Sequence, residues 1–367
     1  MSMAEVGMRP PASPLRRRAL RAVRWLFTPL RPDDYLELIN PLWSTRELRG
    51  RVERVEPERG GAATVLIRPG FDWVGHRPGQ YVRLGVVIDG VHHWRAYSLT
   101  SSPDRPDGLI SVTPKRVDGG VVSPFLVERV HPGEVVRLGE VEGSFTLPDR
   151  LDRGLLFVTA GSGITPVMSM LRHLAPGPGL RDVVHVHSAR EADGVTFGDE
   201  LAALEKQHEG FRLELRITSE DGRFTPADLD ALCPDWRERE TYACGPGELL
   251  DALHKHWKGH GDVGRLHHER FQPIVGGEDA EGAGGTVRFA HRNLDADCPP
   301  GTPILVAGEN AGVDMPFGCR VGVCHTCVLP IREGRIRDLR TNVVSEKHNE
   351  IVRTCVHGAE GRVTVEL

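Results

Sequence analysis

The chain has 367 residues, with 46 lysines and arginines against 51 acidic residues and therefore a formal net charge of −5. This mildly acidic balance argues against general binding to nucleic acid. The length suits two or three domains, and no uninterrupted apolar run approaches the roughly 20 residues that a bilayer span needs. The start does not resemble a signal peptide, because Arg21 and Arg24 break any apolar stretch. We therefore expect a cytoplasmic protein.

Residues 1–46 form a basic extension, with eight arginines against four acids, which leaves a net charge of −9 for the remainder. Within it, residues 15–30 read LRRRALRAVRWLFTPL, in which apolar residues recur at helical spacing between arginines. Such a basic amphipathic helix can lie on an anionic membrane surface or on a membrane-bound partner, which would give peripheral membrane contact at the inner face. The alternative is a helix packed against the protein's own body, with solvated arginines.

Four further segments follow in chain order. Residues 47–150 hold short alternating strands separated by Gly and Pro, a pattern that predicts an antiparallel β-barrel. Residues 151–262 alternate strands with helices, which predicts an α/β domain with a parallel sheet. Residues 263–284 include a Gly-rich acidic stretch and are predicted to be a linker. Residues 285–367 form a compact third unit.

The third unit contains four cysteines in a distinctive pattern, with Cys319, Cys324 and Cys327 in one short run and Cys355 further on. This C-x4-C-x2-C…C spacing resembles the ligand pattern of plant-type [2Fe–2S] ferredoxins. The resemblance implies that the four thiolates hold such a cluster within a β-grasp-like α+β fold. Gly322 allows the backbone to wind closely around the cluster and to turn N–H groups toward its sulfurs.

Zinc and disulfides are the alternatives for these cysteines. Structural zinc sites usually pair two short Cys or His knuckles, and the distant Cys355 breaks that symmetry. A disulfide framework suits a small secreted domain, whereas this chain is long and has an odd number of cysteines. The cluster is therefore favoured, and Cys298, which lies outside the motif, is expected to be a small buried residue.

The run Arg95-Ala96-Tyr97-Ser98 lies at a barrel strand that we expect over residues 96–100. A guanidinium presents a fixed fork of donors to a phosphate, and a tyrosine ring can lie flat against a flavin. This run resembles the R-x-Y-S motif of the ferredoxin-NADP reductase superfamily. The resemblance implies a bound FAD, with Arg95 on its pyrophosphate, Tyr97 against the isoalloxazine ring and Ser98 beside N5. Taken alone, the motif could also be an ordinary strand with a surface arginine.

Two neighbouring segments strengthen the resemblance, because residues 78–81 and 119–123 match the same family in order and spacing. Gly120 lets the backbone approach the pyrophosphate, and Val122 and Ser123 are expected to begin a short helix whose N–H groups face it. The adenosine side of this site is expected to be lined by Thr113 and Lys115.

Residues 155–166, LLFVTAGSGITP, read as a strand, a glycine turn and the start of a helix. Thr165 suits the N-cap and Pro166 the first helical position, so that free N–H groups would face a dinucleotide pyrophosphate. The third glycine of the general fingerprint is absent. The turn resembles the family's G-x-G-I-T-P element, which implies a nicotinamide nucleotide site at Gly161 and Gly163.

Two elements near the end of the α/β segment resemble the family's hydride-transfer site. Cys244-Gly245-Pro246 is similar to the C-G-P element, which implies that Cys244 lies near the reactive carbon of the nicotinamide and that Gly245 leaves room for the ring. Phe271 is implied to stack over the flavin until the nicotinamide displaces it. A buried structural cysteine and a core phenylalanine are the alternatives.

The choice of nicotinamide nucleotide depends on the residues after the second strand of this domain, Ser188-Ala189-Arg190. An NAD-specific site tends to place an acid there for the ribose 2′-hydroxyl. A hydroxyl and a guanidinium suit a 2′-phosphate instead, so Ser188 and Arg190 favour NADPH over NADH. Arg223 is either a further contact or a solvated turn residue.

Residues 47–367 thus resemble an oxidoreductase in which NADPH, FAD and a [2Fe–2S] cluster act in series and electrons leave singly. Residues 31–44, RPDDYLELINPLWS, together with the basic helix resemble actinobacterial NADPH reductases that serve membrane-bound acyl-CoA desaturases or alkane hydroxylases. We therefore expect an iron-containing oxygenase or desaturase as acceptor, with fatty acid desaturation favoured. The alternatives are an NADH-dependent reductase of a soluble ring-hydroxylating or epoxidising oxygenase, and a non-catalytic electron carrier with a degenerate flavin site.

Overall fold

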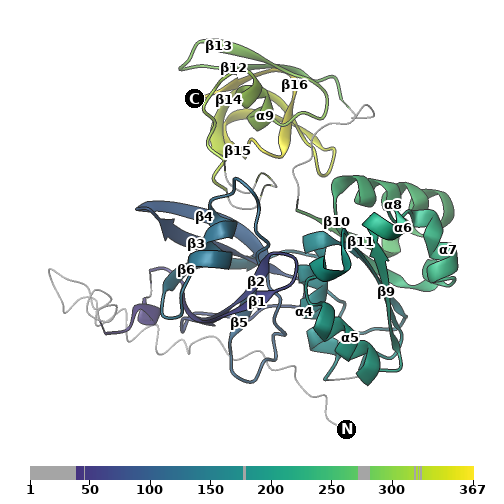
Figure 1. Cartoon of the computed structure of the whole chain (residues 1–367). Coiled ribbons are helices and arrows are strands. Elements are labelled where there is room, and N and C mark those ends of the chain that lie inside the picture. Colours follow the sequence, from purple (N-terminus) through teal and green to yellow (C-terminus); the bar gives the residue numbers. More distant parts are fainter. Residues whose placement is uncertain are drawn as a thin grey trace, which may run out of the picture. The chain divides into compact units, whose positions relative to one another are not determined.

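The computed structural model describes residues 39–44, 46–176, 179–271, 282–317, 320, 322 and 325–367. The chain divides into two compact units, of which the first comprises residues up to 93 together with 97–269, and the second comprises residues 94–96 together with 270–367 (Figure 1). The amphipathic helix predicted over residues 15–30 and the segment 31–38 lie outside the described residues. Where the chain is described, no helix is long and apolar enough to cross a membrane.

The first unit begins with a six-stranded sheet in the order β4-β3-β6-β1-β2-β5. An isolated bridge between Leu99 and Val112 joins the two ends of this order and closes the predicted antiparallel barrel. Alternate residues of β2, Val65 and Ile67, point inward and form part of the barrel core. The strands are β1 (Arg49–Glu58), β2 (Ala62–Pro69), β3 (Tyr81–Ile88), β4 (Val91–Ser98), β5 (Ile110–Val112) and β6 (Val135–Glu142).

The strand that carries the flavin motif begins earlier than residues 96–100. β4 starts at Val91 because Asp89 and Gly90, with φ of 50° and 80°, turn the chain back from β3. Such a pair with two positive φ angles is the preferred connection of a two-residue hairpin. The motif therefore occupies the last four residues of β4, at the end of the strand.

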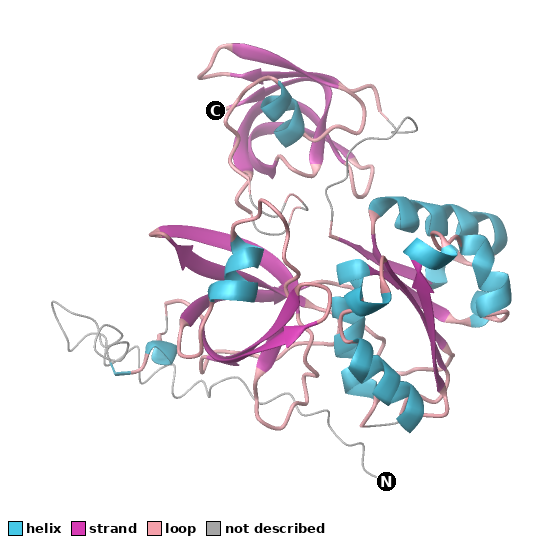
Figure 2. Cartoon of the chain, in the orientation of Figure 1, coloured by secondary structure: helices cyan, strands magenta, loops and turns pink. Residues whose placement is uncertain are grey.

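The second sheet of the first unit has the order β11-β10-β7-β8-β9, and β10, β7, β8 and β9 run parallel (Figure 2). Its strands are β7 (Leu155–Ala160), β8 (Val183–Ala189), β9 (Phe211–Ile217), β10 (Glu240–Gly245) and β11 (Leu266–Arg270). The helices are α4 (Ile164–Leu174), α5 (Gly198–Gln207), α6 (Thr218–Asp221), α7 (Leu229–Leu232) and α8 (Gly247–His260). This arrangement is the predicted α/β domain.

Strand β11 corrects the linker prediction. Residues 266–270 lie at the start of the stretch 263–284 that we expected to be linker, yet they pair with β10 as the edge strand of the parallel sheet. The reason is local, because Leu266 is buried against the same core as Trp236 and Trp257. The residues that follow Leu266 are charged or polar, so the sequence lacks the apolar pattern that would predict a strand here.

Helix α4 joins the parallel sheet to the barrel. Its Arg172 donates from Nη1 to the carbonyl oxygen of Thr100 at 2.8 Å, and its Ser169 hydroxyl donates to the carbonyl oxygen of Ser101 at 2.7 Å. Thr100 and Ser101 lie two and three residues after the end of β4. The helix that leaves the nucleotide turn is therefore anchored to the backbone next to the flavin motif.

The described residues of the second unit form a five-stranded mixed sheet in the order β13-β12-β16-β14-β15, together with helix α9 (Ile304–Asn310) (Figure 2). β12 and β16 are parallel, and the pairs β12–β13, β14–β15 and β14–β16 are antiparallel. Its core includes Phe289, Ile304 and Cys298, whose Sγ donates to the carbonyl oxygen of Thr302 at 3.2 Å. The strands are β12 (Gly285–Phe289), β13 (Leu294–Cys298), β14 (Val328–Asp338), β15 (Val344–Arg353) and β16 (His357–Val365).

Candidate functional site

The flavin motif ends in a buried hydroxyl that has no partner. Ser98 is 6% exposed, and its Oγ forms no hydrogen bond with any described residue. A buried hydroxyl left unpaired is costly, so this position fits a bound group that supplies the missing partner, as the polar edge of a flavin would. Tyr97, one residue earlier, packs partly buried against the barrel core.

Arg95 is the charged residue of the same motif. Its Nη1 donates to the carbonyl oxygen of Trp94 at 2.8 Å, and it forms no salt bridge with a carboxylate among the described residues. A guanidinium whose charge is not balanced by a carboxylate suits a phosphate. The residues present therefore fit FAD, with Arg95 and Ser98 at separate points of the cofactor.

The loop before α3 (Val122–Pro124) is built around Gly119 and Gly120. Gly119 has φ of 71°, and the Gly120 amide donates to the carbonyl oxygen of Val117 at 3.0 Å. The Ser123 hydroxyl accepts from the Val117 amide at 3.2 Å. α3 is only three residues long and passes into one π-helical turn, Phe125–Arg129, so the phosphate contact of this loop stays a prediction.

The two residues expected on the adenosine side differ in how their side chains are used. The Thr113 hydroxyl lies in a buried chain with the hydroxyls of Thr64 at 2.9 Å and Thr100 at 3.1 Å, so it is committed to the barrel interior. Lys115 follows β5 and its charge helps to lower the pKa of the buried His187. The role expected of Lys115 on the adenosine side stays a prediction, whereas the Thr113 side chain does not offer a free hydroxyl.

The glycine turn after β7 has the geometry of a dinucleotide turn but starts its helix earlier than predicted. Gly161 has φ of 54°, residues 161–163 form a 3-10 turn, and α4 begins at Ile164. Thr165 is therefore not the N-cap; it is the second helical residue, and its hydroxyl donates to the carbonyl oxygen of Ser162 at 2.9 Å. Pro166 is the third, where its missing N–H costs no helical hydrogen bond.

The end of β10 packs directly against this turn. A side chain at Gly163 would collide with the backbone of Cys244, so only glycine fits there. Cys244 is fully buried, and in the sheet register it is beside Thr159 of β7. Gly245 and Pro246 then lead into α8, which begins at Gly247. The structure thus brings the G-x-G turn and the C-G-P element together at the carboxyl edge of the parallel strands, where α/β sheets bind ligands.

A partly buried carboxyl group lies near Cys244, and it was missed in the sequence analysis. Glu269 of β11 has an Oε2 that is shielded from solvent and without a hydrogen-bond partner among the described residues. Burial raises the pKa of Glu269 to about 8, and burial together with the Glu269 charge raises the pKa of the Cys244 thiol. Both shifts favour the protonated, neutral forms of these groups. The sequence of residues 267–271 holds no signal for Glu269, because the edge strand that carries it is not apparent in the sequence.

A second buried polar cluster was also missed. The Thr159 hydroxyl is 2.8 Å from His185 Nε2 and 2.7 Å from His187 Nδ1, and all three side chains are buried. Burial lowers the pKa of His187 to about 4 and that of His185 well below its ordinary value, so both imidazoles are neutral. Histidines at alternate positions of a strand were the available signal, because they share one face.

The residues proposed for nucleotide choice lie where β8 ends. β8 runs to Ala189, so Ser188 is its penultimate residue and is buried, while Arg190 is exposed and forms no salt bridge with a described carboxylate. Arg223 instead pairs with Glu248 at 2.9 Å on the surface. Phe271 follows β11 directly and is half-buried, and its stacking on a flavin stays a prediction.

Two of the four motif cysteines, Cys319 and Cys324, lie outside the described residues. The other two, Cys327 and Cys355, are 2% and 1% exposed. The Gly322 amide donates to Cys355 Sγ at 3.1 Å, and the Thr354 hydroxyl donates to the carbonyl oxygen of Cys327 at 2.8 Å. Buried sulfurs with an amide donor aimed at one of them fit an iron–sulfur cluster.

Comparison with known proteins agrees with these three sites. Family models match in succession an oxidoreductase FAD-binding domain at residues 70–146, an oxidoreductase NAD-binding domain at 157–255 and a 2Fe-2S iron-sulfur cluster binding domain at 289–359. The chain is 47% identical to an NADPH oxidoreductase of Mycobacterium tuberculosis, over 93% of this chain and 90% of that protein. It is 31% identical to the ferredoxin reductase component of 3-ketosteroid-9-alpha-monooxygenase from Rhodococcus rhodochrous, over 72% and 79%.

The fold is similar to that of phthalate dioxygenase reductase, with a TM-score of 0.58, 22% identity and coverage of 88% of this chain and 98% of that one. The chain belongs to the ferredoxin-NADP reductase superfamily, among the flavin reductases that carry a C-terminal [2Fe–2S] domain. It is an oxidoreductase whose cofactors are FAD, a nicotinamide nucleotide and a [2Fe–2S] cluster.

Proposed function

We propose that this protein uses NADPH to reduce an iron-containing oxygenase or desaturase, one electron at a time, through its [2Fe–2S] cluster. When bound, FAD converts a two-electron hydride into the single electrons that the cluster can carry. The observation that carries the proposal is the anchoring of α4 beside Ser98. These hydrogen bonds hold the helix that follows the nucleotide turn against the backbone just after Ser98, and Ser98, the turn and Cys244 all belong to the first unit.

The residues of the flavin and nucleotide motifs have distinct proposed roles. Arg95 binds the flavin pyrophosphate, Tyr97 supports the ring, and Ser98 donates to its polar edge. Gly161 and Gly163 admit the nucleotide pyrophosphate, and the neutral Cys244 borders the nicotinamide. Because burial favours the protonated form of Glu269, this residue is proposed to place a neutral proton donor near Cys244 without adding charge to the site.

NADPH is proposed over NADH because β8 ends in a hydroxyl and an exposed guanidinium, with no acid in the run Ser188-Ala189-Arg190. The name of the relative that is 47% identical supports this choice. A relative at 32% identity over 72% of this chain, from Escherichia coli, is named an NADH oxidoreductase, which makes NADH the competing donor. The ratio of kcat/KM for the two donors, measured with ferricyanide, decides between them, and a ratio in favour of NADH would overturn the choice.

The favoured acceptor is a membrane-bound acyl-CoA desaturase or alkane hydroxylase, on the basis of residues 15–44. The names of several relatives, reductase components of monooxygenases, support an oxygenase acceptor more broadly. The test is electron delivery to desaturase-containing membranes by the full chain and by a form lacking residues 1–46. Membrane association and electron delivery unchanged by the deletion would contradict the membrane-bound acceptor and favour a soluble oxygenase.

A further inference from the structure

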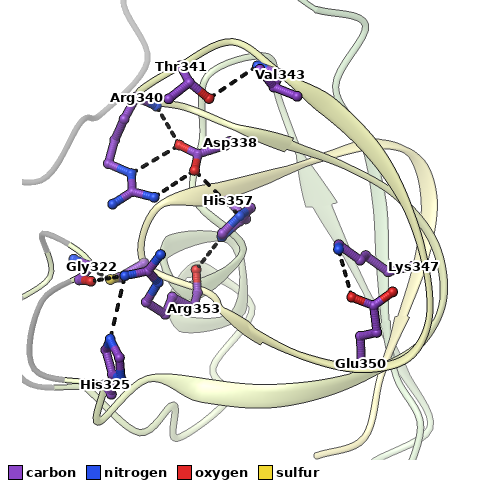
Figure 3. A network of polar contacts seen from close by, with 11 residues as sticks. Gly322, His325, Asp338, Arg340, Thr341, Val343, Lys347, Glu350, Arg353 and His357 are labelled. Carbon is purple, nitrogen blue, oxygen red and sulfur yellow. Dashed lines mark hydrogen bonds and ion pairs between the residues drawn. The ribbon is translucent and has the colours of Figure 1, made fainter.

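One arginine of the second unit bridges the two segments that carry the proposed cluster ligands (Figure 3). Arg353 Nη1 donates to the carbonyl oxygen of Gly322 at 2.7 Å and lies 3.5 Å from His325 Nε2. Gly322 lies between Cys319 and Cys324 in the sequence, and Arg353 is two residues before Cys355. The guanidinium therefore joins the cysteine-rich loop to the end of β15.

Gly322 also contacts the fourth ligand. Its amide donates to Cys355 Sγ at 3.1 Å, while its carbonyl oxygen accepts from Arg353. With φ of 79°, and with Val356 methyl carbons 2.9 Å from where a Cβ would lie, this position admits only glycine. Gly322 is thus held through both its amide and its carbonyl group. A change at Arg353 would therefore alter the position of the Gly322 amide that donates to the Cys355 sulfur.

The backbone of Arg353 is fixed from the opposite side. Its carbonyl oxygen accepts from His357 Nδ1 at 2.9 Å, and His357 Nε2 lies 3.8 Å from Asp338 Oδ2 (Figure 3). Arg353 and His357 stand two residues before and after Cys355. The network therefore places the Arg353 side chain without requiring a carboxylate to hold its guanidinium.

Carboxylates balance the charges of neighbouring arginines but not the charge of Arg353. Arg340 pairs with Asp338 at 2.6 Å, and Arg320 is paired with Glu309. Within the described part of the chain, Arg353 forms no salt bridge with a carboxylate. Its positive charge therefore acts on the cluster loop with less cancellation than theirs.

We propose that Arg353 is a positioning residue that raises the reduction potential of the cluster. Reduction adds one electron to a group that is already anionic, so a fixed cation close to it favours the reduced form. The hydrogen bond to Gly322 gives a second contribution, because it holds the amide that donates to Cys355 and such donors also stabilise added negative charge. The inference rests on the proposed ligand set.

The test is an anaerobic redox titration of the full-length holoprotein, followed by electron paramagnetic resonance of the reduced cluster. Arg353→Gln removes the charge, Arg353→Lys keeps it, and Arg362→Gln is the matched control, because the Arg362 side chain is 71% exposed on β16. We expect a more negative potential in Arg353→Gln, a potential near that of the wild type in Arg353→Lys, and no shift in the control.

A wild-type potential in Arg353→Gln, with the visible spectrum of the cluster intact, would overturn the proposal. If Arg353→Gln loses its cluster, Arg353→Lys decides: a retained cluster at the wild-type potential supports the role of the charge, and loss from this variant as well overturns it. An absent cluster spectrum in the wild type would instead contradict the ligand assignment under the proposed function. The two failures are therefore distinguishable.

Discussion

Arg172 of α4 and Thr100, two residues beyond the flavin motif, are joined by a 2.8 Å hydrogen bond from a guanidinium to a backbone carbonyl oxygen. The same guanidinium makes two hydrogen bonds to Glu200, at 2.8 and 2.6 Å, and stacks 4.9 Å from the centre of the Phe197 ring. One side chain thus holds the nucleotide helix, α5 and the barrel in a fixed relation.

Arg172→Met should therefore slow hydride transfer while leaving FAD bound, because it loosens the nucleotide turn without touching the flavin motif. We also expect a loss of stability of about 1–3 kcal/mol, since the backbone carbonyl and Glu200 lose their partner. Stopped-flow reduction of the bound flavin by NADPH and thermal unfolding measure the two effects. Arg54→Met, at an exposed ion pair with Glu56, is the control, and equal behaviour of the two variants would contradict this role.

Ser98→Ala should separate a binding role from a structural one. The Ser98 hydroxyl has no described partner, so in the absence of FAD its removal should not lower stability. Thr100→Val is the matched change, because the Thr100 hydroxyl bonds to Ser111 at 2.8 Å and Thr113 at 3.1 Å, and its loss should cost about 1 kcal/mol. With FAD bound, flavin reduction should slow by about 10-fold or more in Ser98→Ala. A destabilised Ser98→Ala apoprotein would show that the hydroxyl is structural.

The Glu269 carboxyl should make stability depend on pH. Its pKa is raised to about 8 in the folded protein, so the fold keeps a proton that the unfolded chain releases above about pH 4.5. The folded state binds more protons, and this group's contribution to stability therefore falls as pH rises from about 4.5 to about 8. Glu269→Gln cannot lose that proton, so its melting temperature relative to the wild type should rise across this range. A difference that stays constant from pH 5 to pH 8 would contradict the burial of the neutral acid.

Arg190→Gln should change nucleotide preference. If its guanidinium binds the 2′-phosphate, KM for NADPH should rise by about 10-fold or more while KM for NADH changes little, because NADH lacks that phosphate. Arg223→Gln is the control: the Arg223 side chain is 85% exposed and already paired with Glu248, so we expect less than about a twofold change. Equal losses with both nucleotides in Arg190→Gln would place this arginine elsewhere.

The sequence predicts the elements of this molecule that depend on local patterns. The alternation of the barrel strands, the turn at Gly161 and the buried Cys298 all follow from neighbours a few residues away. Glu269 and His187 could not be predicted in the same way. Their pKa values depend on burial by residues distant in the chain, and a charged or polar residue in a short strand carries no sign of which way it faces.

The predicted boundaries of two elements were wrong for a related reason. Thr165 is a residue type that favours the N-cap. However, the 3-10 turn at residues 161–163 continues directly into the helix, so α4 begins at Ile164, before Thr165. β11 reads as a tail because only Leu266 of its five residues is buried, and its pairing with β10 is a tertiary contact. Residue propensity reports only local preferences. The start of α4 and the formation of β11 depend instead on the structure that surrounds each segment in the fold.

Strand β11 also determines where the protein can be divided. A fragment that ends at residue 262 would lack the edge strand of the parallel sheet and leave the backbone of β10 open to pairing with other chains, a known route to aggregation. It would lose Glu269 and Phe271 together with that strand. A self-contained flavin-reducing fragment must therefore extend through residue 271, and swaps of ferredoxin units between relatives are best joined after that residue.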